Sequence, residues 1–406
     1  MSLFLILATL WSTSQQLEIQ LLGKTVIPGT ASDLSGMKNI LEDKSPNNRL
    51  GGFGSAIAYT GQGNKYLLLP DRGPGDGANS YSCRYHLAEI TVSTSGKLDF
   101  KLLKTTLLKT PEGNTLTGSS KGFGATGNRF DPEGIRCLKN GSILISDEYG
   151  PSVWLFDSSG KLKHKFLIPD KFLIQNKSDH AEKEFPPSNK KGRVTNKGFE
   201  GIAISPDQKK WLAALQGSLI QDRDPSNSDL KTNGINLRFL ETSIEGKHLR
   251  EIVYKMESAK NGVSEILAIG EEDYLVLERD GDAGESAGFK KIFRISTKNA
   301  TDVSKIISLP APKLPEGIIP VSKTLFLNLL DSKFGLKGKD FPAKIEGLAF
   351  GPDLPDGRKL LIITTDNDFK PDEPTWIYAF AVKIDWLAFH HRSTLGFPTH
   401  PMVCKY

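Results

Sequence analysis

The sequence predicts an all-β fold, a β-propeller for which six blades is the preferred count and five or seven are the alternatives. One short phrase, an acid or a serine followed by an apolar run and a turn, recurs five times. The 39 glycines and 23 prolines fall mostly between short apolar runs, which favours many turns over long helices. Only residues 321–335 follow a fair 3.6-residue period, and that stretch is short.

The five copies of the phrase begin at Ser55, Glu133, Glu200, Glu265 and Glu346, which places their starts 78, 67, 65 and 81 residues apart. Each copy contains two apolar runs joined by a turn, the pattern of a β-hairpin. Apolar runs at residues 152–162, 290–300 and 375–384 predict further strands outside the hairpins. Residues 170–196 form a long insertion, and residues 314–331 are assigned to a degenerate sixth blade. Two β-sandwich domains are the alternative fold, but they do not explain the repetition.

The composition is that of a soluble globular chain. Hydrophobic residues make up 38% and charged residues 24% of the 406 residues, and the net charge is +5. This mild charge, with no basic run interleaved with aromatics, argues against a nucleic-acid partner. Three widely spaced cysteines support neither a zinc site nor a disulfide framework, and leave one disulfide or buried free thiols open. We expect a monomer with one propeller domain over residues 19–385 and a C-terminal tail of unassigned role over residues 386–406.

The N-terminus begins with a nine-residue apolar run that is followed by small polar residues. This pattern predicts a signal peptide over residues 1–18, although it lacks the usual Lys or Arg. A first β-strand or a truncated start is the alternative. No other run is long enough to span a bilayer. We therefore expect a secreted or periplasmic protein.

Each predicted hairpin brings two polar residues to one end, because antiparallel strands return the chain beside its start. The pairs are Ser55 with Asp71, Glu133 with Asp147, Glu200 with Gln216, Glu265 with Glu278 or Asp280, and Glu346 with Asp366. A propeller places equivalent hairpin ends on one face, where the carboxylates repel one another unless a cation lies among them. Oxygen ligands without clustered His or Cys favour Ca²⁺ over Mg²⁺. The alternative is that each glutamate accepts backbone hydrogen bonds between blades and only closes the ring.

The glycine that follows several of these glutamates suits close backbone approach near a crowded axis. Basic residues are expected on the same face, namely Arg72, Arg136, Lys197 and Arg279. They are either ion-pair partners of the acids or ligands of phosphate oxygens, for which Arg has a matching fork of donors.

These phrases resemble the phytase-like family, which is described by the esterase-like activity of phytase. The resemblance rests on "GSAIAY…YLLLPDRG", "RFDPEGIR…ILISDEYGPSVWLFD", "KGFEGIAISPD…LAALQG", "SEILAIGEEDYLVLERD" and "IEGLAFGPD…LLIITTDNDF", in that order over about residues 50–380. It implies a likeness to calcium-dependent alkaline phytases, six-bladed propellers that hydrolyse phosphomonoesters. The acids that carry over are Asp71, Glu133, Asp147, Glu148, Glu200, Glu265, Glu278, Asp280, Glu346, Asp366 and Asp368. Gln216 and Ser55 depart from the pattern by replacing acids.

The leading hypothesis is a metal-dependent hydrolase of a small phosphorylated substrate, with Ca²⁺ as the expected cofactor. Glu133 or Glu346 would take a proton from the attacking water, and the other nine acids would be metal ligands. Arg72, Arg136, Lys197 and Arg279 would bind the substrate. The alternatives are a non-catalytic binding module with a structural Ca²⁺ or an acid-and-Arg face, and a metal-dependent lactonase or esterase.

Overall fold

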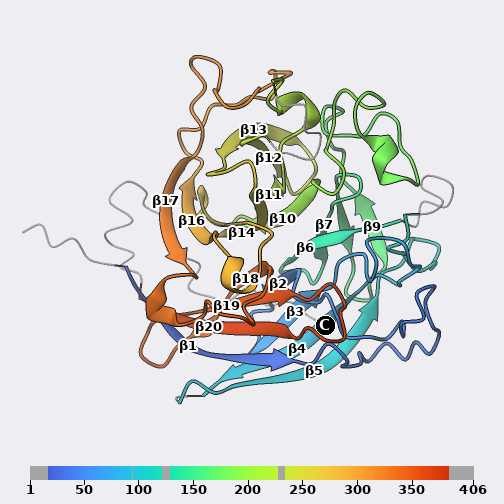
Figure 1. Cartoon of the computed structure of the whole chain (residues 1–406), viewed down its shortest axis with the longest axis vertical. Coiled ribbons are helices and arrows are strands. Elements are labelled where there is room, and N and C mark those ends of the chain that lie inside the picture. Colours follow the sequence, from blue (N-terminus) through green and yellow to red (C-terminus); the bar gives the residue numbers. More distant parts are fainter. Residues whose placement is uncertain (1–16, 94, 121–128, 227–233, 384–406) are drawn as a thin grey trace, which may run out of the picture.

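Twenty strands form five four-stranded antiparallel sheets around a common axis in the described part of the chain (Figure 1). The computed structural model describes residues 17–93, 95–120, 129–226 and 234–383. Each sheet is one blade, so the predicted all-β propeller is confirmed. The number of blades is five, one of the counts that the sequence left open.

The blades follow one another along the chain. Blade 1 consists of β2 (Ala56–Tyr59), β3 (Lys65–Leu69), β4 (Arg84–Val92) and β5 (Leu98–Leu107). Blade 2 consists of β6 (Pro132–Cys137), β7 (Ile143–Asp147), β8 (Ser152–Phe156) and β9 (Leu162–Lys165). Blade 3 consists of β10 (Phe199–Ile204), β11 (Lys210–Leu215), β12 (Asn236–Ser243) and β13 (His248–Lys255). Blade 4 consists of β14 (Gly262–Ala268), β15 (Asp273–Arg279), β16 (Lys290–Ser296) and β17 (Ser322–Asn328).

Blade 5 joins the two ends of the described chain in one sheet. It consists of β18 (Lys344–Asp353), β19 (Lys359–Asp366), β20 (Thr375–Lys383) and, outermost, β1 (Glu18–Ile27). The β1 strand pairs antiparallel with β20 from Glu18 opposite Lys383 to Ile27 opposite Thr375. Backbone hydrogen bonds between the first and last strands therefore close the ring.

The five copies of the repeated phrase form the two inner strands of the five blades. Their first strands, β2, β6, β10, β14 and β18, surround the axis, and each contacts the first strand of the next blade (Figure 1). The contact between β18 and β2 completes the circle. Because all five strands run the same way along the axis, their starting residues gather at one end of it.

The segment that we assigned to a sixth blade contributes one strand to blade 4. Within residues 314–331, the described structure contains β17 and no second strand. The β17 strand pairs with β16 from Lys291 opposite Asn328 to Ser296 opposite Ser322. A separate blade would need its own inner hairpin, and the Pro-Glu-Gly at residues 315–317 forms part of a loop instead.

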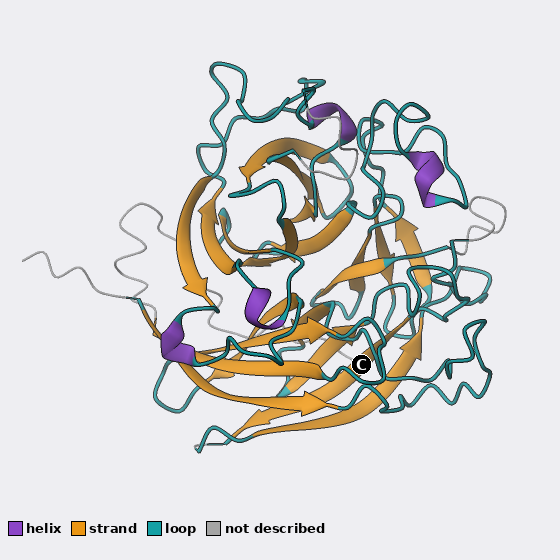
Figure 2. Cartoon of the chain, viewed as in Figure 1, coloured by secondary structure: helices purple, strands orange, loops and turns teal. Residues whose placement is uncertain are grey.

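Five large clusters of buried hydrophobic residues lie between neighbouring blades in the described part of the chain. Leu67 and Ile145, for example, belong to the cluster between blades 1 and 2, and Leu277 and Ile363 to the one between blades 4 and 5. Outside the strands, the described chain is mainly loops, with four short 3₁₀ helices (Figure 2). These helices are η1 (Ala181–Glu184), η2 (Ile220–Asp222), η3 (Gly284–Ser286) and η4 (Ser332–Phe334).

Two predicted segments fall largely outside the described residues. Residues 1–16 of the predicted signal peptide and all of the predicted tail over residues 386–406 lie there. The described residues contain no helix with the length and apolar character that crossing a membrane requires.

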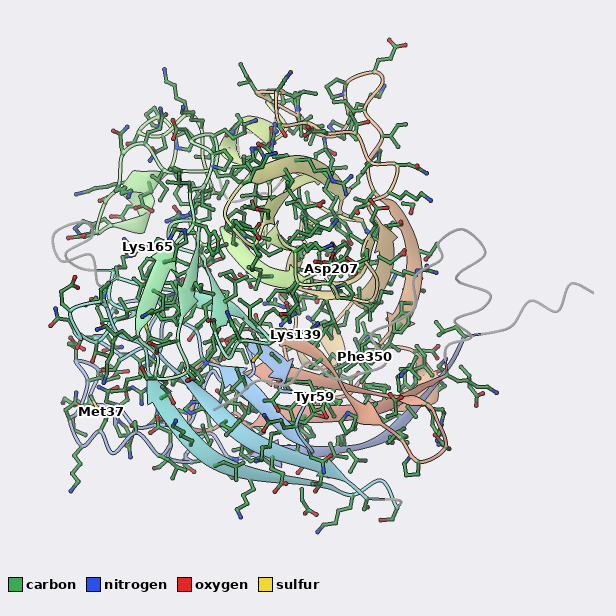
Figure 3. All side chains as sticks on the ribbon, turned by 180° about the vertical axis from the view of Figure 1, so that it is seen from behind. Met37, Tyr59, Lys139, Lys165, Asp207 and Phe350 are labelled. Atoms are coloured by element: carbon green, nitrogen blue, oxygen red, sulfur yellow. The ribbon has the colours of Figure 1, made fainter. Side chains whose placement is uncertain are left out.

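The far ends of the inner hairpins also meet near the axis. Figure 3 shows the molecule from behind, with Tyr59, Lys139, Asp207 and Phe350 labelled around the centre of the ring. The Lys139 backbone N–H donates to Gln208 Oε1, which links the hairpin turns of blades 2 and 3. The hairpins are therefore held together at the end of the axis opposite to their starting residues.

Close packing around the axis explains the glycine that follows glutamate in three blades. A Cβ added at Gly201 would lie 2.8 Å from the backbone nitrogen of Ile266, on the next inner strand. Gly134 and Gly347 face similar crowding from the neighbouring blade. The absence of a side chain at these positions lets adjacent inner strands approach closely.

We predict that Gly201→Ala lowers the melting temperature, because the added methyl overpacks the axis at a cost on the order of 1–3 kcal/mol. Differential scanning calorimetry measures the effect. Gly338→Ala is the matched control, since a Cβ at Gly338 meets nothing within 4 Å. Equal melting temperatures for the two variants would contradict the role given to Gly201.

Candidate active site

The starting ends of the inner hairpins place two sets of five residues around the axis. In β6, β10, β14 and β18 the pairing with the second strand shifts at the start, so one residue bulges out of the ladder. A bulge bends the strand locally and re-aims the side chain. The bulged residues, with Ser55 just before β2, make up what we call the bulge ring: Ser55, Glu133, Glu200, Ser264 and Glu346.

The residues at the ends of the second strands form a second set, the partner ring. In blade 2, for example, Pro132 pairs with Asp147, so Glu148 is the next residue outward and its backbone N–H donates to the Asp131 carbonyl. The partner ring consists of Asp71, Glu148, Gln216, Arg279 and Asp366. Three of the predicted hairpin pairs, in blades 1, 3 and 5, match residues of the two rings.

A cavity of about 230 Å³ lies over these rings. It is lined by five carboxylates, Asp71, Glu133, Glu148, Glu200 and Glu346. Five cationic side chains also line it, Arg72, Lys197, Lys260, Arg279 and Lys344. The structure therefore brings together eight of the predicted site residues, Asp71, Arg72, Glu133, Glu148, Lys197, Glu200, Arg279 and Glu346, in one strongly polar cavity.

In blade 4 the bulged residue lies one position before Glu265, the residue at which the aligned phrase begins. Val263 pairs with Glu278 and Glu265 with Leu277, so the bulged residue is Ser264. Glu265 takes the position that Gly134, Gly201 and Gly347 hold in other blades. A shift of one residue turns a strand side chain to the opposite face. Ser264 lines the cavity and Glu265 does not, which corrects the predicted alignment.

Glu265 forms a buried ion pair with Arg136, which is also absent from the cavity lining. Arg136 Nη2 lies 2.9 Å from Glu265 Oε1, and both side chains are buried. The same guanidinium donates to the backbone carbonyls of Ile57 in blade 1 and Ile266 in blade 4. The Arg136–Glu265 pair thus ties three blades together across the axis, away from the cavity.

Three more predicted metal ligands, Asp147, Glu278 and Asp280, have structural partners outside the cavity lining. Asp147 accepts hydrogen bonds from the backbone N–H of Asp131 and Gly150 and from the Ser152 hydroxyl. Glu278 accepts from Tyr254, Asn261 and Lys323. Asp280 accepts from Lys290 and from the backbone N–H groups of Gly288 and Phe289. These carboxylates hold turns and neighbouring strands, because their oxygens are already used.

Asp366 and Asp368 lie beside the cavity and share the ammonium group of Lys344. Lys344 Nζ lies 2.9 Å from Asp366 Oδ2 and also contacts Asp368. Burial raises the pKa of Asp366 to about 7, although Lys344 opposes that shift. Although burial disfavours its charge, Asp366 and Glu346 raise the pKa of Lys344 well above its usual range. Lys344 therefore supplies positive charge on the blade 5 side.

Carboxylates concentrate on the blade 2 side of the cavity. Oxygen atoms of Asp131, Glu133 and Glu148, all buried, lie within 4.8 Å of one another. We call this group the acid triad. Sequence analysis missed Asp131, yet the "DPE" tripeptide contains the evidence, because residues two apart on a strand face the same way.

The triad has oxygen atoms that no described residue satisfies. Asp131 accepts from the Arg72 side chain at 2.6 Å and from the Arg72 backbone N–H at 3.1 Å. Glu148 Oε1 is buried without a hydrogen-bond partner, and Glu133 makes no hydrogen bond or ion pair with any described residue. Burial, followed by the nearby Glu200, raises the pKa of Glu133 well above its usual range. Burial raises the pKa of Glu148 to about 7.

Several other charged residues of the cavity have partners. Gln216 Nε2 donates to Glu200 Oε1 at 2.5 Å, while Glu200 Oε2 is buried and unpartnered. Lys197 donates to Gln216, and burial lowers the pKa of Lys197. Arg279 forms an ion pair with Glu346. Protein cations thus pair with the acids of blade 5, whereas Glu148 in blade 2 and Glu200 in blade 3 keep carboxylate oxygens without a partner among the described residues.

The residues of the triad fit a hard divalent cation. All of the donors are carboxylate oxygens, the ligands that Ca²⁺ and Mg²⁺ prefer. The unpartnered Glu148 Oε1 and the unpaired Glu133 provide free lone pairs, whereas both oxygens of Asp131 already accept from Arg72. An added cation would also offset the mutual repulsion of these carboxylates, which is stronger in a buried site.

Comparison with known proteins gives one family and several similar proteins. A profile of the phytase-like family, described as "Esterase-like activity of phytase", matches residues 48–369. An "Uncharacterized secreted protein" of Arthroderma benhamiae is 26% identical over 407 aligned residues, which cover 78% of this chain and 76% of the relative.

Two solved structures are more distant. An ancestral GH74 enzyme has 11% identity and a TM-score of 0.35, with 79% of this chain and 34% of that chain covered. A gluconolactonase from Xanthomonas campestris has 9% identity and a TM-score of 0.34, with 90% of both chains covered. At these TM-scores neither structure supports an argument about function.

We predict that the free energy of unfolding of the unchanged protein decreases with rising pH more steeply than that of the Glu265→Gln variant. Burial raises the pKa of Glu265 to about 7 from its usual value of 4.5, although Arg136 opposes the shift. The folded protein therefore binds this proton more tightly than the unfolded chain. That stabilisation is complete below pH 4.5 and is lost as the pH rises through 7.

Denaturant unfolding of both proteins at pH 5 and pH 8 measures the difference. Each unit of pKa shift corresponds to about 1.4 kcal/mol, so we expect a change of a few kcal/mol between the two pH values. Glu245→Gln serves as the control, because Glu245 lies in an exposed turn. A difference between Glu265→Gln and the unchanged protein that stays constant with pH would contradict the prediction.

Proposed function

The chain belongs to the phytase-like family, and on that premise we propose that it is a metal-dependent phosphoester hydrolase whose active site is the cavity on the propeller axis. The observation that supports this most is the acid triad. Glu133 and Glu148 have unpartnered carboxylate oxygens in a cavity that Arg and Lys side chains also line. Carboxylates for a cation, next to donors for anionic oxygens, are the groups that phosphate-ester hydrolysis requires.

The proposed cofactor is Ca²⁺, held mainly by Glu133 and Glu148, with Asp131 behind them. When bound, it would neutralise phosphate charge and lower the pKa of a nearby water. The preference for Ca²⁺ over Mg²⁺ rests on the all-carboxylate donor set, since Mg²⁺ usually keeps several waters.

Substrate binding is assigned to the guanidinium groups of the cavity. Arg72 is fixed by Asp131 at 2.6 Å and stacks on Tyr149, with its guanidinium carbon 5.3 Å from the ring centre. Arg279 is fixed by Glu346. A guanidinium that is already oriented loses little freedom when it binds two phosphoryl oxygens. Arg136, which the sequence also suggested for this role, is committed to Glu265.

Glu133 is a better candidate than Glu346 for the general base. Glu346 accepts from Arg279, which keeps its carboxylate occupied, whereas Glu133 has no partner among the described residues. Glu133 would bind the cation through one carboxylate oxygen and keep the other oxygen for the proton. Glu133 would take a proton from a water as the water oxygen attacks phosphorus.

Cleavage of the phosphorus–ester oxygen bond then releases an alcohol. Lys197 would protonate the leaving oxygen, because burial lowers the pKa of its ammonium and makes it a stronger acid. The water proton remains on Glu133, and both residues exchange protons with solvent to complete the cycle. No covalent intermediate with the protein is involved.

Secretion is part of the same proposal. The relative from Arthroderma benhamiae is described as a secreted protein. Extracellular fluid contains Ca²⁺ at concentrations that suit weak carboxylate sites, whose dissociation constants are on the order of 10⁻⁴–10⁻³ M.

We predict that Glu133→Gln lowers kcat about 10²–10⁴-fold, the usual contribution of a general base. The melting temperature should stay the same or rise, because a neutral amide replaces a poorly compensated buried acid. Phosphate release from a panel of phosphate esters measures turnover. The control is Asp147→Asn, which should lower the melting temperature and leave turnover of the folded protein near normal, because Asp147 holds backbone N–H groups.

We further predict that Ca²⁺ raises the melting temperature of the unchanged protein at pH 7.5, and that Glu133→Gln/Glu148→Gln abolishes this increase. Scanning calorimetry with added Ca²⁺ or with a chelator tests the metal site without relying on activity. Asp147→Asn should keep its response to Ca²⁺. If Ca²⁺ has no effect on melting and the panel shows no phosphate release, the proposed metal-dependent hydrolase is wrong. If the protein cleaves only lactones or carboxylic esters, its substrates belong to that class and not to the phosphate esters.

A further inference from the structure

Blade 4 differs from the other blades because it contributes no carboxylate to either ring. Blades 1, 2, 3 and 5 each contribute at least one carboxylate to the bulge ring or the partner ring. Blade 4 contributes Ser264 to the bulge ring and Arg279 to the partner ring. Lys260, on the loop before β14, also lines the cavity at this blade. This side of the cavity therefore offers hydrogen-bond donors and positive charge, and no ring carboxylate.

The Ser264 hydroxyl is buried, lines the cavity and has no hydrogen-bond partner. Only 1% of Ser264 is exposed, and its Oγ makes no hydrogen bond with any described residue. Ser55 occupies the same ring in blade 1 and behaves differently, since its Oγ donates to the Gly52 carbonyl at 2.8 Å. A buried hydroxyl without a hydrogen-bond partner destabilises the folded protein. The contrast with Ser55 therefore indicates that a ligand accepts a hydrogen bond from the Ser264 hydroxyl.

Arg279 lines the same cavity and has a donor without a partner among the described residues. Its Nη2 donates to Glu346 and its Nη1 to the Asp280 carbonyl, while its buried Nε has no partner. The two existing bonds fix the orientation of the guanidinium. There is room for a ligand nearby, because Gly281 lines the cavity and a Cβ added there would meet nothing within 4 Å.

We propose that Ser264, Arg279 and Lys260 form an oxyanion subsite that binds a phosphoryl group of the substrate. The proposal deepens the proposed function and rests on it for the identity of the anion. A hydroxyl donor, a guanidinium N–H and an ammonium group complement the several acceptor oxygens of a phosphoryl group. The subsite lies two blades from the acid triad around the ring, so cation and anion are held by different blades.

The division between blades also explains why blade 4 lacks a bulge-ring glutamate. A carboxylate at position 264 would place a negative charge next to the bound anion and would compete with it for Arg279. The same bulge accommodates glutamate at Glu133, Glu200 and Glu346, so backbone geometry does not require serine there.

The test compares Ser264→Ala, Ser264→Glu and the matched control Ser55→Ala. Calorimetric titration with inorganic phosphate, in Ca²⁺ and in chelator, measures binding without turnover. We expect Ser264→Ala to weaken phosphate binding roughly tenfold or more, the usual effect of losing a hydrogen bond to a charged group. Ser264→Glu should abolish detectable binding, and Ser55→Ala should bind phosphate normally. Melting temperatures verify that each variant is folded.

Parallel titrations with sulfate and acetate define the anion. Binding of phosphate and sulfate, with weaker binding of acetate, supports a subsite for tetrahedral oxyanions. Tighter binding of acetate would overturn the phosphoryl assignment. Unchanged phosphate binding in folded Ser264→Ala and Ser264→Glu would overturn the subsite itself.

Failure of the subsite can be distinguished from failure of the proposed function. If Ser264→Glu loses phosphate binding while the unchanged protein hydrolyses no ester, the anion subsite stands and the hydrolase proposal falls. If the unchanged protein hydrolyses phosphate esters and both Ser264 variants keep its KM, the hydrolase stands and the subsite falls.

Discussion

The convergence of five inner strands on one narrow axis shapes both the packing of the propeller and the chemistry of its cavity. Adjacent strands approach so closely that Gly134, Gly201 and Gly347 have no room for a side chain. The residues before these glycines are glutamates, so the ring that closes the propeller also buries carboxylates next to one another. Burial raises the pKa of such groups, and each must find a partner, give up its charge or bind a cation. The chemistry of the cavity follows from how each blade meets this demand.

The blades compensate their buried carboxylates in different ways. Blade 5 uses Lys344 and the neighbouring Arg279, and Arg136 compensates Glu265 across the axis. These contacts strengthen the ring and remove the acids concerned from any reaction. Among the described residues, Glu133 of blade 2 has no such partner, and one buried oxygen of Glu148 has none either. Because burying unpaired acids is destabilising, we interpret blade 2 as the part of the ring where function outweighs stability. Blade 4 presents the opposite charge, which gives the cavity a cationic side as well as an acidic one.

Much of the fold was predictable, because a repeated phrase with hairpin periodicity can be read directly along the chain. The residues that line the cavity were harder to predict from the sequence. Blades 1, 3 and 5 followed the predicted pairs, whereas blades 2 and 4 differed by a single residue. Matching one glutamate to another selected Glu265, but hydrogen-bond register selects Ser264. Asp147, Glu278 and Asp280 look like ring acids in the sequence, and only their local partners distinguish them.

The propeller class, the five inner hairpins and the gathering of acids at one end of them could be predicted from the amino-acid sequence alone. Those features depend on local periodicity and turn chemistry, which short segments encode. The tertiary structure decided the number of blades, since the strand at Ser322–Asn328 could join blade 4 only through pairing with β16. It also decided which acids are paired and which remain free. Charge compensation reaches across blades, as between Arg136 and Glu265, so the partner of a buried carboxylate lies far away in sequence and near only after the ring has closed.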